Sequence, residues 1–148
     1  MNAPATLAAP RAPAGDAPPD GFEALTAYGG FIARVGTLYW HPQRRVVGIR
    51  IGEHHLNHLG MPHGGMLATL ADTAIGMVIN RFSGAQQQSV TVHLGLDYLS
   101  AAQAGDWIEA HVDIDKRGAR LHFASCRLTC GERCLLKASA TFAVVAAR

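Results

Sequence analysis

The chain has 148 residues, of which 49% are hydrophobic and 16% are charged, and its formal net charge at pH 7 is +2. This hydrophobic content excludes an intrinsically disordered chain, and the length fits one domain with a single core. The lysines and arginines form no basic stripe, so the sequence does not predict nucleic acid binding.

The N-terminal part is expected to hold a tail, a short helix and two strands. Residues 1–20 contain five of the seven prolines and are predicted to be a flexible tail, which leaves 21–148 as the folded domain. The run VVGIRIG alternates and is rich in β-branched residues, as is typical of a strand. The strands are expected at 37–40 and 46–53. The helix is expected from Gly21 onward, because apolar residues recur at near-helical spacing, namely Phe22, Leu25, Tyr28 and Ile32.

One long helix and four further strands are predicted in the rest of the chain. The segment from Gly64 to about Phe82 is apolar on nearly every face, which indicates a buried helix. Four strand-like runs separated by glycine-containing turns follow it: SVTVHLGLDYLS, DWIEAHVDIDKR, ARLHFASCRLTC and RCLLKASATFAVVA. The sequence therefore predicts an α+β fold, in which an antiparallel sheet of five to six strands wraps around one central helix.

The cellular location is inferred from what the sequence lacks. The most apolar segment, 64–79, contains Asp72 and is shorter than the roughly 20 residues of a membrane-spanning helix. The first residues lack the pattern of a secretory signal. The three cysteines, an odd number, do not suit a disulfide framework. We expect a soluble cytoplasmic protein whose cysteines are buried, reduced thiols.

Asp72 is the most informative residue, because it is the one formally charged side chain between His54 and Asn80. A carboxylate on a buried helix is unfavourable unless it is paired, and such groups concentrate where chemistry needs an acid or base. The alternative is a structural carboxylate in a hydrogen-bond network at a subunit interface. Before the helix, Gly64 and Gly65 leave its first N–H groups uncovered, which is the outline of an oxyanion hole.

The run NHLGMPHGGMLATLAD resembles the signature of hotdog-fold acyl-CoA thioesterases of the PaaI-like type, and the similarity continues through SVTVHLGLDYLSAAQAGD and DKRGARLHF. The resemblance implies a hotdog fold, hydrolysis of acyl-CoA thioesters, and a homodimer or homotetramer. It implies no cofactor other than the coenzyme A (CoA) that the substrate itself carries.

The resemblance also implies roles for individual residues. Asp72 would act as nucleophile or general base, and the N–H of Gly64 would bind the thioester carbonyl. Asn57 would position water or the thioester, and Thr91, at the start of the strand after the helix, would assist from the partner subunit. His63 and Gly65 belong to the predicted substrate-binding region, and the ring of His63 is expected to hydrogen-bond across the turn. The remaining predicted contacts, to CoA phosphates at the pocket mouth, are Arg81, Arg117 and Arg120.

Other chemistries find less support in the sequence. His54 and His58 have the spacing of a zinc pair on a helix, but Gly60 and Pro62 argue against that helix, so no metal is expected. No serine lies in a G-x-S-x-G motif. Two rivals on the same fold stay open. One is an acyl-CoA-binding protein without turnover. The other is a hydratase or dehydratase, which would use a histidine that the predicted helix lacks.

Overall fold

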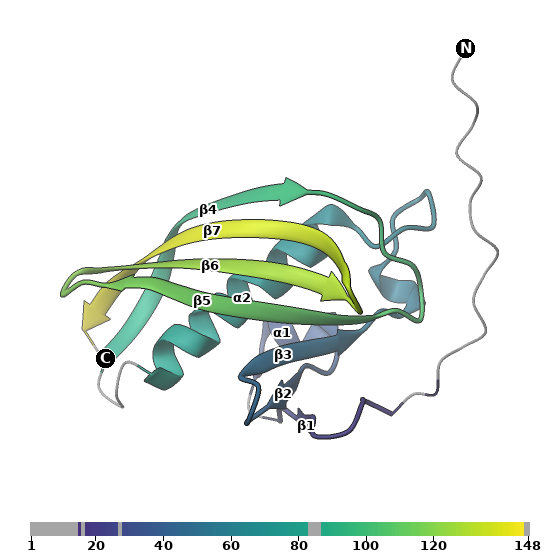
Figure 1. Cartoon of the computed structure of the whole chain (residues 1–148), viewed down its shortest axis with the longest axis horizontal. Helices are drawn as coiled ribbons and strands as arrows, with labels where there is room; N and C mark the ends of the chain where they lie inside the picture. Colours follow the sequence, from purple (N-terminus) through teal and green to yellow (C-terminus); the bar gives the residue numbers. More distant parts are fainter. Residues whose placement is uncertain (1–14, 16, 27, 83–86, 147–148) are drawn as a thin grey trace, which may run out of the picture.

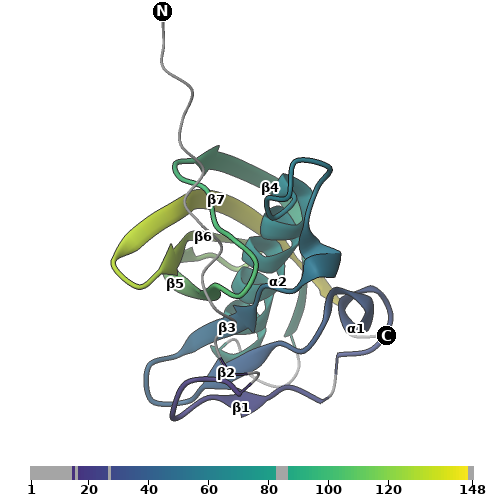
Figure 2. The same ribbon diagram turned by 90° about the vertical axis from the view of Figure 1, so that its right-hand side faces the viewer.

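The computed structural model describes residue 15 and residues 17–26, 28–82 and 87–146. In these ranges a seven-stranded antiparallel sheet curves around one long helix (Figures 1 and 2). The predicted α+β architecture is therefore confirmed. The sheet has more than the five to six strands that we expected, because a two-residue strand, β1 (Glu23–Ala24), extends one edge.

The central helix, α2, extends over Gly64–Phe82, where the sequence predicted it. Its buried side chains include Leu70, Ala74 and Ile75, each at most 1% exposed, and they pack into the hydrophobic core under the sheet. A helix that is apolar nearly all round is stable only when other elements cover it, and here the curved sheet provides that cover.

The strands are ordered β1-β2-β3-β5-β6-β7-β4 across the sheet, so the strand that follows α2 in sequence lies at one edge. Figure 1 shows β4 beside β7, at the opposite edge from β1. Among the described residues, β4 pairs with β7 and with no other strand. The strands after β1 are β2 (Tyr39–His41), β3 (Val46–Arg50), β4 (Gln87–Tyr98), β5 (Trp107–Arg117), β6 (Leu121–Cys130) and β7 (Arg133–Ala146).

Three hydrogen bonds hold β4 antiparallel along α2. The side chains of Tyr98, Thr91 and Ser89 donate in turn to groups at the start, the middle and the end of the helix. Residues far apart along α2 thus each have a partner on the same edge strand.

The predicted helix near residue 22 is wrong for most of its length. Glu23 and Ala24 pair with β2 instead, and the Leu25 N–H donates to the Leu38 carbonyl at 2.8 Å. The helix that does form, α1, covers only Phe31–Val35 and follows Gly30, whose φ of 65° interrupts a regular helix. The apolar spacing here reflects packing on the core, which Tyr28 and Ile32 still contact.

The predicted tail, 1–20, lies mostly outside the described residues. At its C-terminal end, the Arg50 guanidinium donates to the Ala17 carbonyl at 3.0 Å, so this part contacts the domain. In the described part of the chain, no helix is both long and apolar enough to cross a membrane.

Candidate functional site

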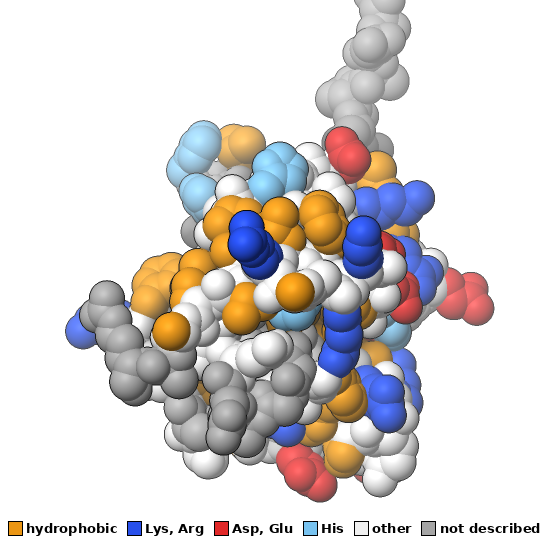
Figure 3. All heavy atoms as spheres, turned by 90° about the vertical axis from the view of Figure 1, so that its left-hand side faces the viewer, with side chains coloured by type: hydrophobic (Ala, Val, Ile, Leu, Met, Phe, Trp, Pro, Cys, Tyr) orange, Lys and Arg blue, Asp and Glu red, His pale blue; other side chains and the backbone are white. Residues whose placement is uncertain are grey.

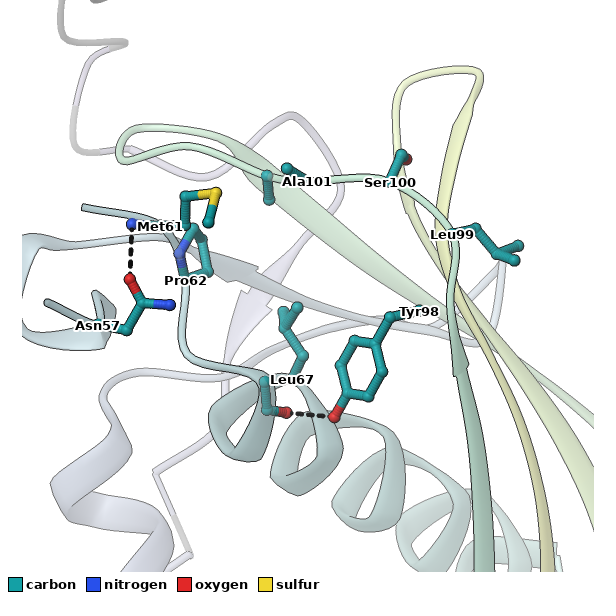
Figure 4. A pocket seen from close by; sticks show the side chains of 10 residues that line it. Asn57, Met61, Pro62, Leu67, Tyr98, Leu99, Ser100 and Ala101 are labelled. Carbon is teal, nitrogen blue, oxygen red and sulfur yellow. Dashed lines mark hydrogen bonds between the residues drawn. The ribbon is translucent and has the colours of Figure 1, made fainter. Parts of the chain in front are cut away.

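The loop before α2 is shaped by Asn57. Its Oδ1 accepts the backbone N–H groups of Leu59 (2.9 Å) and Met61 (3.2 Å), and the second of these bonds is drawn in Figure 4. Because Oδ1 is used to hold the loop, the group left for a ligand is the Nδ2 amide, which has no hydrogen-bond partner among the described residues. Asn57 therefore presents a hydrogen-bond donor beside the start of the helix.

Most of the first N–H groups of α2 are already occupied. The His63 carbonyl accepts from Met66 (2.9 Å) and Leu67 (3.2 Å), and His63 Nδ1 accepts from the Gly65 N–H at 2.9 Å. The expected hydrogen bond of the His63 ring across the turn is thus present. Within the described part of the chain, the Gly64 N–H has no partner. The helix start therefore offers one free donor, and the helix dipole favours an oxygen that gains negative charge there.

Tyr98 of β4 packs against Gly64. Its hydroxyl donates to the Gly64 carbonyl at 2.6 Å, and a Cβ added at Gly64 would lie 3.4 Å from the Tyr98 ring. Figure 4 shows Tyr98 reaching from β4 to the first turn of α2. Around it lies a cavity of about 370 Å³, named here the Gly64 pocket, which is lined by Asn57, Met61, Pro62, Gly64, Leu67 and Tyr98–Ala102.

Asp72 lies in a different cavity. Thr91 Oγ1 donates to Asp72 Oδ1 at 2.7 Å, which fixes the orientation of the carboxylate. This cavity, the Asp72 pocket, has a volume of about 500 Å³ and is bounded by α1, α2, β4 and β7. Asp72 lies eight positions after Gly64 in the helix, about 12 Å along the axis, so the two cannot act on one carbonyl carbon within a single chain.

Thr91 does not open its strand as we expected. Its hydroxyl donates to Asp72 of its own chain, and its assistance to a site completed by a second subunit stays a prediction. Strand β4 begins at Gln87, so Thr91 lies inside the strand, where β4 passes the middle of α2. Asp72 and Thr91 form one half of the candidate site, and Gly64 and Asn57 form the other.

The predicted phosphate-binding arginines lie at the end of α2 and at the β5–β6 turn. The Arg81 guanidinium lies 4.9 Å from the Trp40 ring centroid, and Arg117 donates to the Phe82 carbonyl at the end of α2. Arg120 is exposed in the β5–β6 turn. Figure 3, which faces this end of the molecule, shows lysines and arginines scattered among hydrophobic side chains rather than gathered into one patch. Within one chain, none of these arginines lines either pocket.

Sequence reasoning missed His55 as well as Tyr98. His55 is 4% exposed; its Nδ1 accepts the Gly52 N–H, its Nε2 bonds the Val35 carbonyl, and its own carbonyl accepts the His63 N–H at 2.8 Å. Burial lowers the pKa of this imidazole. Nothing in the sequence indicates that His55 links Gly52, Val35 and His63, because it is one of several histidines in this segment and its contacts form only in the folded chain.

The other candidate ligands do not form a metal site. His54 lies in a short 3₁₀ helix (Glu53–His55) and bonds the Val35 carbonyl at 3.0 Å. The described residues contain no group of three or more His, Cys, Asp or Glu side chains placed to hold a metal ion. Cys126 is buried, whereas Cys130 and Cys134 are partly exposed, and all are free thiols.

A long helix held inside a curved antiparallel sheet is the arrangement of the hotdog fold. The chain belongs to the thioesterase superfamily, whose family model matches residues 59–136. The resemblance seen in the sequence is thereby confirmed.

Similar proteins agree with this assignment. The chain is 42% identical over 127 residues to a putative esterase, PA0474, of Pseudomonas aeruginosa, covering 84% of this chain and 95% of that protein. It is 34% identical over 88 residues to mouse acyl-coenzyme A thioesterase 13, covering 60% of this chain and 62% of that one. Among solved structures, the BH2602 protein of Bacillus halodurans with CoA matches with a TM-score of 0.72 and 27% identity, covering 80% of this chain and 78% of that one.

Proposed function

We propose that the protein hydrolyses acyl-CoA thioesters to a free acid and CoA, at a site that two copies of the chain build together. The carrying observation is the separation of the two half-sites along α2. A carbonyl carbon bound at the Gly64 N–H needs a carboxylate close by, and the same helix holds its own Asp72 about 12 Å away. The Asp72 of a second copy meets this requirement.

The edge strand β4 supports such pairing. Its outer edge is free in the described structure, and Val90 and Val92 on it are 49% and 57% exposed. A long strand with an unpaired edge and exposed β-branched residues is unfavourable in an isolated monomer, and pairing with an identical edge removes this problem. Two β4 strands joined antiparallel bring the two α2 helices side by side in opposite directions, so that each Asp72 approaches the other Gly64.

In the proposed reaction each half-site has its own task. The Gly64 N–H binds the thioester oxygen as it gains negative charge, and Asn57 Nδ2 donates to the thioester or to the attacking water. Asp72, oriented by Thr91, either attacks the carbonyl carbon or removes a proton from water. In the general-base route, water adds to the carbonyl carbon, the C–S bond breaks, and the leaving thiolate of CoA takes the proton from Asp72. In the nucleophilic route, the thiolate leaves first, and water then hydrolyses the mixed anhydride between the acyl group and Asp72 to release the acid.

The activity is tested by following thiol release from a panel of acyl-CoA esters. Hydrolysis is the expected result. Binding of the esters without thiol release would show an acyl-CoA-binding protein instead.

The shared site is tested by mixing Asp72→Asn and Asn57→Ala subunits under conditions of subunit exchange. In a hybrid dimer one site is doubly defective and the other is native, so random mixing should restore about a quarter of the wild-type activity. The matched control mixes Asp72→Asn with Thr91→Val, which alter the same half-site; these hybrids contain no native site and should show no recovery. Equal recovery in both mixtures, or none in the first after verified exchange, would contradict the shared site.

A further inference from the structure

The Asp72 pocket contains a further set of side chains that the proposed hydrolysis does not use. Beyond Asp72 and Thr91 its walls include Tyr28 and Ile32 from the α1 region, Gly76 and Met77 from α2, and Phe142 from β7. We propose that this pocket receives the acyl group, that the acyl group is an uncharged hydrocarbon or aryl chain, and that Ile32 and Gly76 limit its size. This inference rests on the proposed function.

The charges around the pocket favour an acyl group over the CoA arm. Among the described residues that line it, Asp72 is the one formally charged side chain, and no lysine or arginine is present to meet a phosphate. Elsewhere in the pocket, the Ser89 hydroxyl donates to Asn80 Oδ1 at 2.9 Å, so these polar groups partly satisfy each other. A second carboxylate on an acyl chain would lose its hydration here without gaining a cation.

The apolar walls of the pocket favour a hydrocarbon group. Met77 and Phe142 are 3% exposed and belong to the hydrophobic core, so the pocket extends that core outward from the carboxylate. A hydrocarbon chain laid against them is removed from water, and each methylene buried contributes about a fourfold gain in binding. The Gly64 pocket offers the donor for the thioester oxygen, which leaves the acyl group to extend past Asp72 of the other chain.

Gly76 is the position that keeps the space open. Glycine inside a helix is less favourable than alanine by about 1 kcal/mol, so its presence in the middle of α2 needs a reason. A Cβ added at Gly76 would lie 3.3 Å from the Phe142 ring, closer than ordinary contact. Any side chain there would press on the pocket wall and reduce the volume left for an acyl chain.

Ile32 lines the same pocket from α1. No residue of this short helix is buried, and Ile32 is only partly buried where it packs on the core. Phe31, beside it in the same helix, is 66% exposed and does not line the pocket, so it provides a matched control.

The test compares kcat/KM along a series from butanoyl-CoA to dodecanoyl-CoA in wild type, Ile32→Ala, Gly76→Ala and Phe31→Ala. Ile32→Ala should move the preferred chain length upward, and each additional methylene that the pocket accommodates should raise kcat/KM about fourfold. Gly76→Ala should move it downward, and Phe31→Ala should leave the profile as in wild type. Adipoyl-CoA, which differs from hexanoyl-CoA by a terminal carboxylate, should be at least about 100-fold poorer.

An unchanged length profile in Ile32→Ala, or equal rates for adipoyl-CoA and hexanoyl-CoA, would overturn the inference. So would a profile shifted by Ala101→Leu, in the Gly64 pocket, and not by Ile32→Ala. If wild type hydrolyses no ester, the proposed function fails. Binding of the alkyl group in the Asp72 pocket is then tested separately, by calorimetric titration of S-alkyl-CoA thioethers of increasing length. Affinity in that titration should depend on length in wild type and shift in Ile32→Ala, and an identical dependence in both would again overturn it.

Discussion

Tyr98→Phe isolates the contribution of the contact between β4 and the start of α2. The substitution removes the hydroxyl that donates to the Gly64 carbonyl at 2.6 Å and keeps the ring that covers Gly64. A neutral hydrogen bond contributes about 1 kcal/mol to stability, and Tyr98 is 52% exposed, so water can replace the lost donor. We expect the free energy of unfolding to fall by no more than about 1 kcal/mol.

The effect on catalysis should be larger in proportion, because Gly64 also carries the free N–H. Deleting one oxyanion donor lowers kcat by about 10²- to 10³-fold, and a donor that is loosened rather than deleted should lose a smaller part of this. We expect kcat to fall about threefold to tenfold with little change in KM. Steady-state kinetics and thermal unfolding measure the two effects, with Tyr39→Phe as a control tyrosine outside both pockets. A wild-type kcat, or an effect confined to KM, would refute a positioning role for Tyr98.

Further predictions concern catalysis, phosphate contacts, pH and thiol reactivity. Asp72→Asn keeps a group that accepts the Thr91 hydroxyl, so kcat should fall by about 10²-fold or more with an unchanged circular dichroism spectrum, and near-normal turnover would exclude the catalytic role. If Arg117 and Arg120 bind phosphates, replacing both with Ala should raise KM for acyl-CoA but not for acyl-pantetheine; equal changes for both substrates would contradict this. Because burial lowers the pKa of His55, the unfolded chain binds a proton that the folded chain does not below about pH 6.5, so the free energy of unfolding should fall as the pH decreases, by at most about 1.4 kcal/mol per unit for this group. Urea unfolding from pH 7 to 5 should show a shallower decrease for His55→Gln, and identical slopes would refute this account. Burial raises the pKa of the Cys126 thiol to about 12, so iodoacetamide at pH 8 should label it about 10³-fold more slowly in the native than in the urea-unfolded protein, as read by mass spectrometry.

The features that could be predicted from sequence are those fixed by local pattern. The helix Gly64–Phe82 was predictable because nearly every position in it is apolar, and the loop before it because glycine and proline interrupt regular structure. The strand at Glu23–Ala24 was not predictable, since its conformation comes from pairing with β2, a partner distant in sequence. Apolar spacing alone could not distinguish packing on the core from helix formation.

The candidate site shows the same division. Asp72 and Gly64 could be proposed from the sequence because a single charge in an apolar helix is conspicuous and two glycines precede it at the helix start, whereas Asn57 was proposed from the resemblance to the thioesterase signature. The position of Thr91 depends on how β4 runs along α2, and that of Arg117 depends on where the β5–β6 turn meets the end of the helix. Tyr98 reads in the sequence as one more residue of a strand, and only its 2.6 Å bond to Gly64 reveals a role.

His55 connects the end of α1 to the residue that precedes α2. Its ring holds the Val35 carbonyl at the end of α1, and its own carbonyl holds the N–H of His63, next to the free donor of Gly64. A movement of α1 away from α2 therefore pulls on the same residue that sets the position of the helix start. We therefore expect a molecule too large for the space beneath α1 to disturb the start of α2 as well, because the Val35 carbonyl is held by the rings of His54 and His55 and the His63 N–H by the backbone carbonyl of His55.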